Sequence, residues 1–175
     1  MLHTRALVAD DLELICRHRY EMFREAGREP AVLDRMTPAF RTWLQPRLVD
    51  GTYFGFITLD GDTPVAGIGL MEIDWPPHPL HPEQDRRGYV LNVYVEPSHR
   101  QRGIARMLMD RAEAAFSERG LPYAILHATQ MGTSALRGAR LDIDHRNGQS
   151  RRRAPKGVRL RISEPARISP NGPRG

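Results

Sequence analysis

The stretch VYVEPSHRQRGIARML, residues 93–108, combines residue types that can bind a bulky anion. A β-rich run ends at Pro97, a basic turn that contains Gly103 follows, and the spacing of apolar residues then becomes helical. The first turn of a helix has free backbone N–H groups and the positive end of the helix dipole, and a glycine lets an anion approach the backbone closely. Positive charge comes from three arginines, Arg100, Arg102 and Arg106. The stretch therefore predicts a pyrophosphate site.

The spacing of this motif separates it from two common nucleotide-binding patterns. It is not GxxxxGK[ST], which disfavours a nucleoside triphosphatase, and it is not GxGxxG, which disfavours a Rossmann dinucleotide site. Residues 100–105, RQRGIA, instead match [QR]-x-x-G-x-[GA], with Val95-Glu96-Pro97 upstream. The chain resembles the GNAT superfamily of N-acetyltransferases over roughly residues 3–130. Two features carry the resemblance: this motif, which lies between a predicted strand and a predicted helix, and the order of the predicted elements.

The resemblance implies an α/β fold, with a GNAT-like mixed central sheet flanked by helices, and acetyl-CoA as the co-substrate. It implies that the diphosphate lies on the backbone amides of the basic turn. It also implies that the pantetheine arm bonds to the preceding strand in the manner of an added strand. The residues that the resemblance implies for cofactor binding are Val93, Val95, Arg100, Gln101, Arg102, Gly103, Ile104, Ala105 and Arg106.

The chemistry that the resemblance implies is direct attack of a neutral amine on a thioester. This reaction needs a base for the ammonium proton, donors for the oxyanion and an acid for the departing thiolate. A strand N–H near Val93 is the candidate oxyanion donor. Glu72 is the first candidate for the base and His127 the second, and Asn92 is a candidate to position a substrate or a water molecule.

Local patterns predict the elements that position these residues. The first helix has one face formed by Leu12, Ile15, Arg19, Met22 and Phe23. A second helix begins at Pro30, and two apolar runs around the DGD of residues 60–62 indicate a hairpin. The predicted order is β-α-α-β-β-β-α-β, which indicates a mixed sheet that begins antiparallel and has a crossover helix late.

A proline-rich segment, residues 76–88, interrupts this pattern between two predicted strands. Its four prolines predict a loop. Histidine and acidic residues in the segment DWPPHPLHPEQD suggest a metal cluster at first sight, but their spacing fits no ligand template and prolines keep them from sharing a face. We therefore expect no metal site here, and we expect the loop to border the site of the acceptor.

Composition divides the chain near residue 130. From residue 131 to residue 175 there are eleven Lys or Arg against three Asp or Glu, a net charge of +8, whereas all Phe, Trp and Tyr lie before residue 131. Such a segment cannot bury enough apolar surface to offset the entropy of ordering. We therefore divide the chain into a GNAT-like domain that binds acetyl-CoA, residues 1–130, and a disordered basic tail, residues 131–175.

The tail stands where the GNAT pattern continues with a helix that carries a tyrosine, often as LYE-LGF, followed by two more strands. That tyrosine is the usual acid for the thiolate. One choice of codons for residues 133–149, read one base later, gives RPLYEALGWTSTTEMA, which fits the absent segment. In this choice the middle base of each shifted codon can be selected freely, whereas most first and third bases are fixed by the amino-acid sequence. We hypothesise a frameshift after about Gly132, which would impair the activity.

These observations favour an N-acetyltransferase that acts on a primary amine of a small molecule or a peptide. Two other classes stay open. One is a CoA-binding protein without catalytic activity, and the other is a nucleic-acid binder that uses the basic tail. The tail has no aromatic residue on which a base could stack, so nucleic acid is not the expected partner.

Other features of the sequence bear on where the protein works. No apolar run approaches the length that spans a membrane, and the N-terminus carries charges where a signal peptide needs an apolar stretch. The lone cysteine, Cys16, rules out an internal disulfide. We therefore expect a cytoplasmic protein without a membrane partner, and a homodimer stays open.

Overall fold

The structure is a computed structural model that describes residues 1–77, 79, 82–127 and 159–163. Its elements in chain order are β1 (Leu2–Ala6), η1 (Ala9–Asp11), α1 (Leu12–Glu25), α2 (Pro30–Val49), β2 (Tyr53–Asp60), β3 (Thr63–Asp74), β4 (Arg86–Val95), η2 (Pro97–His99), α3 (Ile104–Glu118), β5 (Tyr123–His127) and β6 (Arg159–Ser163). The elements η1 and η2 are single turns of 3-10 helix. The predicted order of helices and strands from β1 to β5 is confirmed.

The strands form one sheet in which their spatial order follows the chain order. β1, β2, β3 and β4 pair antiparallel, and β4, β5 and β6 pair parallel. The hairpin predicted at residues 60–62 joins β2 to β3, and α3 forms the crossover between the parallel strands β4 and β5. The predicted mixed sheet flanked by helices is therefore confirmed.

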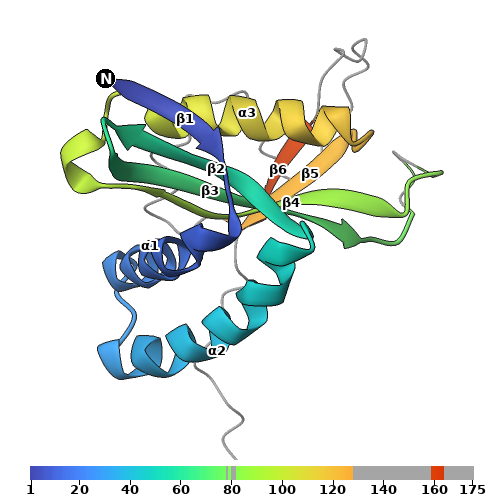
Figure 1. Cartoon of the computed structure of the whole chain (residues 1–175). Coiled ribbons are helices and arrows are strands. Elements are labelled where there is room, and N and C mark those ends of the chain that lie inside the picture. The colour runs from blue at the N-terminus through green and yellow to red at the C-terminus, as the bar shows by residue number, and fades with distance from the viewer. Residues whose placement is uncertain (78, 80–81, 128–158, 164–175) are drawn as a thin grey trace, which may run out of the picture.

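Helices cover both faces of this sheet (Figure 1). α3 covers one face, where Leu108, Met109 and Phe116 pack against sheet residues such as Leu70 and Val90. α1 and α2 cover the other face, where a second apolar cluster gathers Ile15, Cys16, Phe40, Leu44 and Tyr53. Each helix buries an apolar stripe on the sheet. β4 therefore lies between the two clusters, one on each face of the sheet.

β6 is a strand that the sequence analysis did not anticipate. It lies inside the basic tail and pairs in parallel with β5, from Tyr123↔Arg159 to His127↔Ser163. Its sequence, RLRIS, alternates basic and apolar residues, which is the period of a strand. The high charge of the flanking residues concealed this short pattern. Apart from β6, the predicted disordered tail lies outside the described residues.

No helix within the described ranges is both long enough and apolar enough to cross a membrane.

Candidate active site

The basic turn between β4 and α3 has free backbone donors, as the sequence predicted. The first backbone bond of α3 runs from the Met107 N–H to the Gly103 carbonyl, at 3.0 Å. No described atom accepts a hydrogen bond from the N–H groups of residues 101–106. Gln101 and Gly103 both have positive φ, +62° and +76°. These donors and the dipole of a 15-residue helix form a site suited to a phosphate group.

Gly103 faces open space. A Cβ built on this residue would meet no atom within 4 Å, although its φ of +76° favours glycine over other residues. The backbone around it is exposed, as are the side chains of Arg102 and Arg106. A bulky anion such as the diphosphate of acetyl-CoA can therefore reach the backbone here, so the residues present fit this group.

Arg100 differs from the other two arginines of the turn. Its Nη2 donates to both carboxylate oxygens of Glu25 at 2.7 Å, and its Nε donates to the Val95 carbonyl at 2.9 Å. The guanidinium therefore connects the turn to the last residue of α1 and to the end of β4, and it is less available to an anion than Arg102 and Arg106.

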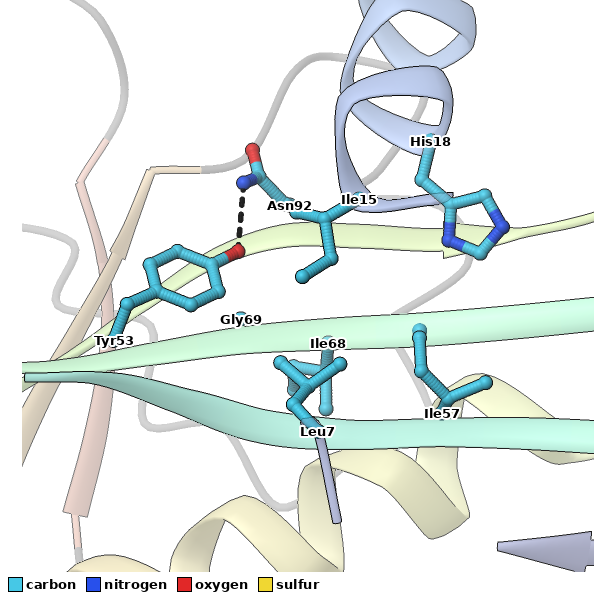
Figure 2. Close-up of a pocket in the computed structure, with 9 residues that line it drawn as sticks. Leu7, Ile15, His18, Tyr53, Ile57, Ile68, Gly69 and Asn92 are labelled. Atoms are coloured by element: carbon cyan, nitrogen blue, oxygen red, sulfur yellow. Dashed lines mark hydrogen bonds between the residues drawn. The ribbon is translucent and has the colours of Figure 1, made fainter. Parts of the chain in front are cut away.

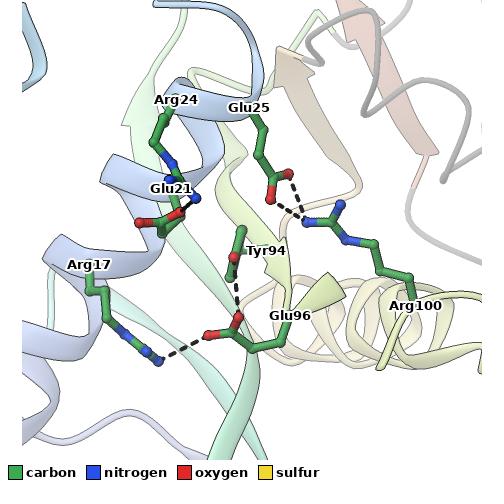
Figure 3. A network of polar contacts seen from close by, with 7 residues as sticks. All are labelled: Arg17, Glu21, Arg24, Glu25, Tyr94, Glu96 and Arg100. Carbon is green, nitrogen blue, oxygen red and sulfur yellow. Dashed lines mark hydrogen bonds and ion pairs between the residues drawn. The ribbon is translucent and has the colours of Figure 1, made fainter. Parts of the chain in front are cut away.

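Figure 3 shows that Arg100 belongs to a larger polar network between α1 and the end of β4. Arg17 forms an ion pair with Glu96 at 3.1 Å, and the Tyr94 hydroxyl donates to the same carboxylate at 3.3 Å. Burial and the neighbouring carboxylates raise the pKa of Tyr94 to about 12. The network fixes α1 against the strand that leads into the basic turn.

β4 separates from β5 in its second half. The two strands pair at three positions, the last being Val90↔Leu126, whereas β4 continues to Val95. No described residue of β5 pairs with residues 91–95. Within the described residues, one edge of β4 is therefore unpaired, or open, at the point where the strand leads into the basic turn.

A β-bulge accompanies this separation. The register between β3 and β4 shifts so that Asn92 and Val93 together oppose Ile68. Asn92 has a φ of +54°, which is rare for a residue other than glycine. Such a bulge bends its strand, which fits the divergence of β4 from β5.

The predicted cofactor residues Val93 and Val95 lie on the open part of β4. The Glu96 N–H donates to the Val65 carbonyl at 2.8 Å, so this N–H faces β3, and the Val95 carbonyl of the same peptide faces the opposite edge. Because these directions alternate along a strand, the backbone groups of Val95 and Val93 face the open edge. The bond from Arg100 Nε to the Val95 carbonyl agrees with this direction. The edge offers main-chain donors and acceptors to an extended ligand.

Asn92 lies in a buried polar cluster on the side of α1 and α2. Its Nδ2 donates to the Tyr53 hydroxyl at 2.9 Å, and its Oδ1 accepts from Arg19 Nη1 at 2.5 Å. Figure 2 shows Asn92 and Tyr53 beside a small cavity of about 10 Å³, which His18 also lines. Burial raises the pKa of the Tyr53 phenol. The Asn92 side chain thus connects two residues of the protein, beside its predicted role toward a substrate or water.

Arg19 is the residue of this cluster that the sequence analysis left without a role. Its guanidinium carbon lies 4.9 Å from the centre of the Phe23 ring and 4.4 Å from that of Phe40. Its Nε is buried and has no hydrogen-bond partner among the described residues, and burial lowers the pKa of the guanidinium. The available signal was an arginine on the otherwise apolar face of the first predicted helix.

Glu72, the first candidate for the base, lies elsewhere on the sheet. Its carboxylate accepts a hydrogen bond from Arg86 Nη1, and Glu72 pairs with Gly88 across β3 and β4. Gly88 and Val93 are five residues apart along β4, which corresponds to roughly 17 Å. The structure therefore does not bring Glu72 beside Val93. The side chain of His127, the second candidate, lies outside the described part of the chain.

Across the described residues, no group of three or more His, Cys, Asp or Glu side chains is placed to hold a metal ion.

The chain matches a known protein family and several solved structures. Residues 15–137 match the family model described as the acetyltransferase (GNAT) family. The crystal structure of a GCN5-related N-acetyltransferase from Ralstonia eutropha JMP134 matches this chain with 54% sequence identity and a TM-score of 0.79. The match covers 86% of this chain and 98% of that chain. A search of curated proteins found no match.

Two more distant solved structures share the fold. A predicted acetyltransferase from Clostridium acetobutylicum, crystallised with acetyl-CoA, is 22% identical with a TM-score of 0.75, and the match covers 87% of this chain and 96% of that chain. A ribosomal-protein-alanine N-acetyltransferase from Brucella melitensis biovar Abortus 2308 is 17% identical with a TM-score of 0.57, and the match covers 88% and 99% of the two chains.

Proposed function

Since the chain belongs to the GNAT family of acetyltransferases, we propose that it transfers the acetyl group of acetyl-CoA to a primary amine of a small molecule or peptide. The observation that carries the proposal is the basic turn, in which six consecutive residues, 101–106, have N–H groups without a described acceptor. The co-substrate supplies an activated thioester, and the chain must bind its diphosphate, orient its pantetheine arm and receive the amine.

The residues proposed for the diphosphate are those of the turn and the first turn of α3. Backbone N–H groups of Gln101, Arg102, Gly103, Ile104, Ala105 and Arg106 donate to phosphate oxygens. Arg102 and Arg106 add charge from exposed side chains. In this proposal Arg100 holds the turn in place through its contacts with Glu25 and the Val95 carbonyl, because its guanidinium already has a carboxylate partner and its N–H donates to the Pro97 carbonyl.

The residues proposed for the pantetheine arm and the acetyl group are those of the open edge of β4. Val93 and Val95 bind the arm through main-chain hydrogen bonds, and the Val93 N–H also stabilises the negative charge that develops on the thioester oxygen. These two valines pack their side chains against the α3 cluster, so their amides are held in place by a rigid element.

CoA binding without catalysis remains a second candidate because of Glu72. Its carboxylate is engaged by Arg86, and Gly88, its partner across the sheet, is five residues from Val93 along β4. If no other group accepts the proton of the amine, the chain binds the cofactor and turns it over slowly. Measuring CoA affinity and turnover on the same sample separates the two candidates.

The placement of the diphosphate is tested by Gly103→Asp. Asp tolerates a positive φ better than most residues, so the variant should fold, but its carboxylate projects into the space assigned to the diphosphate. We expect the affinity for CoA, measured by calorimetry, to fall by at least about 100-fold, equivalent to about 2.7 kcal/mol.

Two controls separate charge from backbone strain. Gly120→Asp changes a glycine with a φ of +69° and open surroundings at the other end of α3, and it should bind CoA normally. Gly103→Asn has the volume of the Asp variant without its charge, and it should bind with intermediate affinity. Equal CoA affinity in Gly103→Asp and Gly120→Asp would contradict the placement.

A further inference from the structure

We propose that Arg19 binds a carboxylate of the acceptor, so that the acceptor is a small amine which also carries a carboxylate group. This inference rests on the proposed function, because it places the acceptor beside the segment of β4 to which we assign the acetyl group. Neither the motif of the basic turn nor the comparisons specify an acceptor for this chain.

The first observation is that Arg19 has no carboxylate partner within the described part of the chain. Three other arginines at α1 and α2 do have one: Arg17 pairs with Glu96, Arg41 with Glu13 and Arg100 with Glu25. The three groups that act on Arg19 electrostatically are Tyr53, Tyr89 and Cys16, none of which is a carboxylate. A guanidinium that is removed from water without an opposite charge is costly, and a bound carboxylate would offset this cost.

The second observation is that the guanidinium is held in one place. It lies over the rings of Phe23 and Phe40, and Nη1 donates to Asn92 Oδ1 at 2.5 Å. Asn92 is in turn fixed by its bond to the Tyr53 hydroxyl, at 2.9 Å. A guanidinium with a fixed plane loses little conformational freedom when it binds a carboxylate.

The third observation is that donors remain for a ligand. Nε is buried, and no described atom accepts a hydrogen bond from Nε or from Nη2. The Arg19 side chain as a whole is partly buried, not fully enclosed. Nε and Nη2 lie on one edge of the guanidinium, so a carboxylate that binds Nη2 can accept a second, parallel hydrogen bond from Nε once the side chains that cover Nε shift.

The fourth observation is the position of this cluster relative to the proposed chemistry. Asn92, which Arg19 contacts, is the residue before Val93, and the bulge places its side chain on the side of α1 and α2. A carboxylate bound to Arg19 would therefore lie next to Asn92, the residue that precedes the proposed oxyanion donor. An acceptor that has its amine a few bonds from its carboxylate, such as an α-amino acid, can span this separation.

The experiment compares matched ligands that differ by the carboxylate alone. Full-length protein is titrated by calorimetry with a panel of L-amino acids and with the amines made by their decarboxylation, in the presence and in the absence of CoA. We expect at least one amino acid to bind at least about tenfold more tightly than its amine. Arg19→Gln should abolish this difference, and Arg19→Lys, which keeps the charge but not the planar fork, should retain a part of it.

Arg24→Gln is the control, because it removes an arginine from the same helix that is exposed and paired with Glu21. It should keep the full preference for the carboxylate. An unchanged preference in Arg19→Gln, no preference in the native protein, or tightest binding of a polycationic amine would each overturn the inference. If the native protein does not bind CoA, the proposed function is contradicted instead. The titrations without CoA would still test the role of Arg19.

Discussion

Arg100 and Arg102 are two residues apart, yet their side chains have different surroundings. The Arg100 guanidinium is bound to Glu25 and to the Val95 carbonyl, whereas the Arg102 side chain is exposed and has no ion pair in the described structure. A charge that already has a partner contributes less to a new anion. The two residues should therefore differ in their contribution to cofactor binding, although the sequence motif treats them alike.

We predict that Arg102→Gln weakens CoA binding by about tenfold, about 1.4 kcal/mol, and that Arg100→Gln weakens it by less. The same calorimetric titration at two salt concentrations checks this, because the contribution of an exposed charge is screened by salt. A larger effect of Arg100→Gln would show that its guanidinium leaves Glu25 when the cofactor binds.

The lowered pKa of the buried His18 allows us to predict how the stability of the fold depends on pH. Burial, together with the charge of Arg17, lowers the pKa of His18 to about 4 from 6.5. Between these values the unfolded chain binds a proton that the folded chain does not, so stability decreases as pH falls from about 6.5 to about 4 and levels off below. The full loss attributable to this group is about 3 kcal/mol.

Urea unfolding at pH 7 and at pH 4.5 measures this loss. In His18→Gln, which cannot be protonated, the decrease between the two pH values should be smaller than in the native chain by about 2 kcal/mol. Groups that do not interact with His18, such as Asp60, whose pKa is lowered by its ion pair with the N-terminal ammonium, contribute equally in both proteins. An equal decrease in the native chain and the variant would show that His18 is accessible to protons in the folded state.

At the scale of elements, local patterns predicted α1, α3, the hairpin between β2 and β3, and β5. Each has a period of apolar residues or a turn signal that can be read within one segment. The turn at Gly103 was found for the same reason. By contrast, the Arg19–Asn92–Tyr53 cluster joins three segments that are far apart in the chain, and no local pattern indicates which of them meet. The short strand β6 was missed because basic residues surround it.

The contact between α3 and β4 depends on the absence of a side chain at Gly88. A Cβ there would lie 2.7 Å from Phe116 Cδ1, and Phe116 is fully buried. We predict that Gly88→Ala destabilises the protein by about 1–3 kcal/mol through overpacking. Phe116→Leu, which removes part of the ring, should recover a part of this loss when the two changes are combined.

A double-mutant cycle in urea measures the coupling between the two sites. We expect an interaction of more than about 0.5 kcal/mol, in the direction of compensation. Additive effects would mean that β4 moves away from α3 to accept the new methyl group. In that case the alignment of Val93 and Val95 would change as well, and the affinity for CoA should fall in Gly88→Ala.

At the scale of the whole molecule, the chain has two parts with different net charge, −3 for residues 1–130 and +8 for residues 131–175. The basic turn, the open edge of β4 and the Arg19 cluster all lie in the first part. The family model extends only to residue 137. The acid that should protonate the thiolate is expected from the second part, where the sequence offers no tyrosine.

We therefore predict that the chain acetylates amines poorly, since loss of a general acid costs about 10²–10⁴-fold in rate. Turnover is measured from the thiol released from acetyl-CoA, with the amines that bind in the titrations as acceptors. A rate in the ordinary enzymatic range of about 1–10³ per second would contradict this prediction, and would show that another group takes the role of the tyrosine.

The frameshift hypothesis gives a prediction of its own. A one-base correction before codon 133 should produce a chain that continues close to RPLYEALGW and ends soon after. This chain would lose β6, whose pairing with β5 is part of the present sheet, but it would gain an aromatic helix and strands that bury apolar surface. Because burial of a core outweighs one edge strand, we expect a higher melting temperature, and we expect faster turnover of acetyl-CoA because the tyrosine is restored. A corrected chain that melts no higher than this one, or limited proteolysis that finds residues 133–175 of the present chain as protected as α3, would show that the tail is a genuine part of the protein.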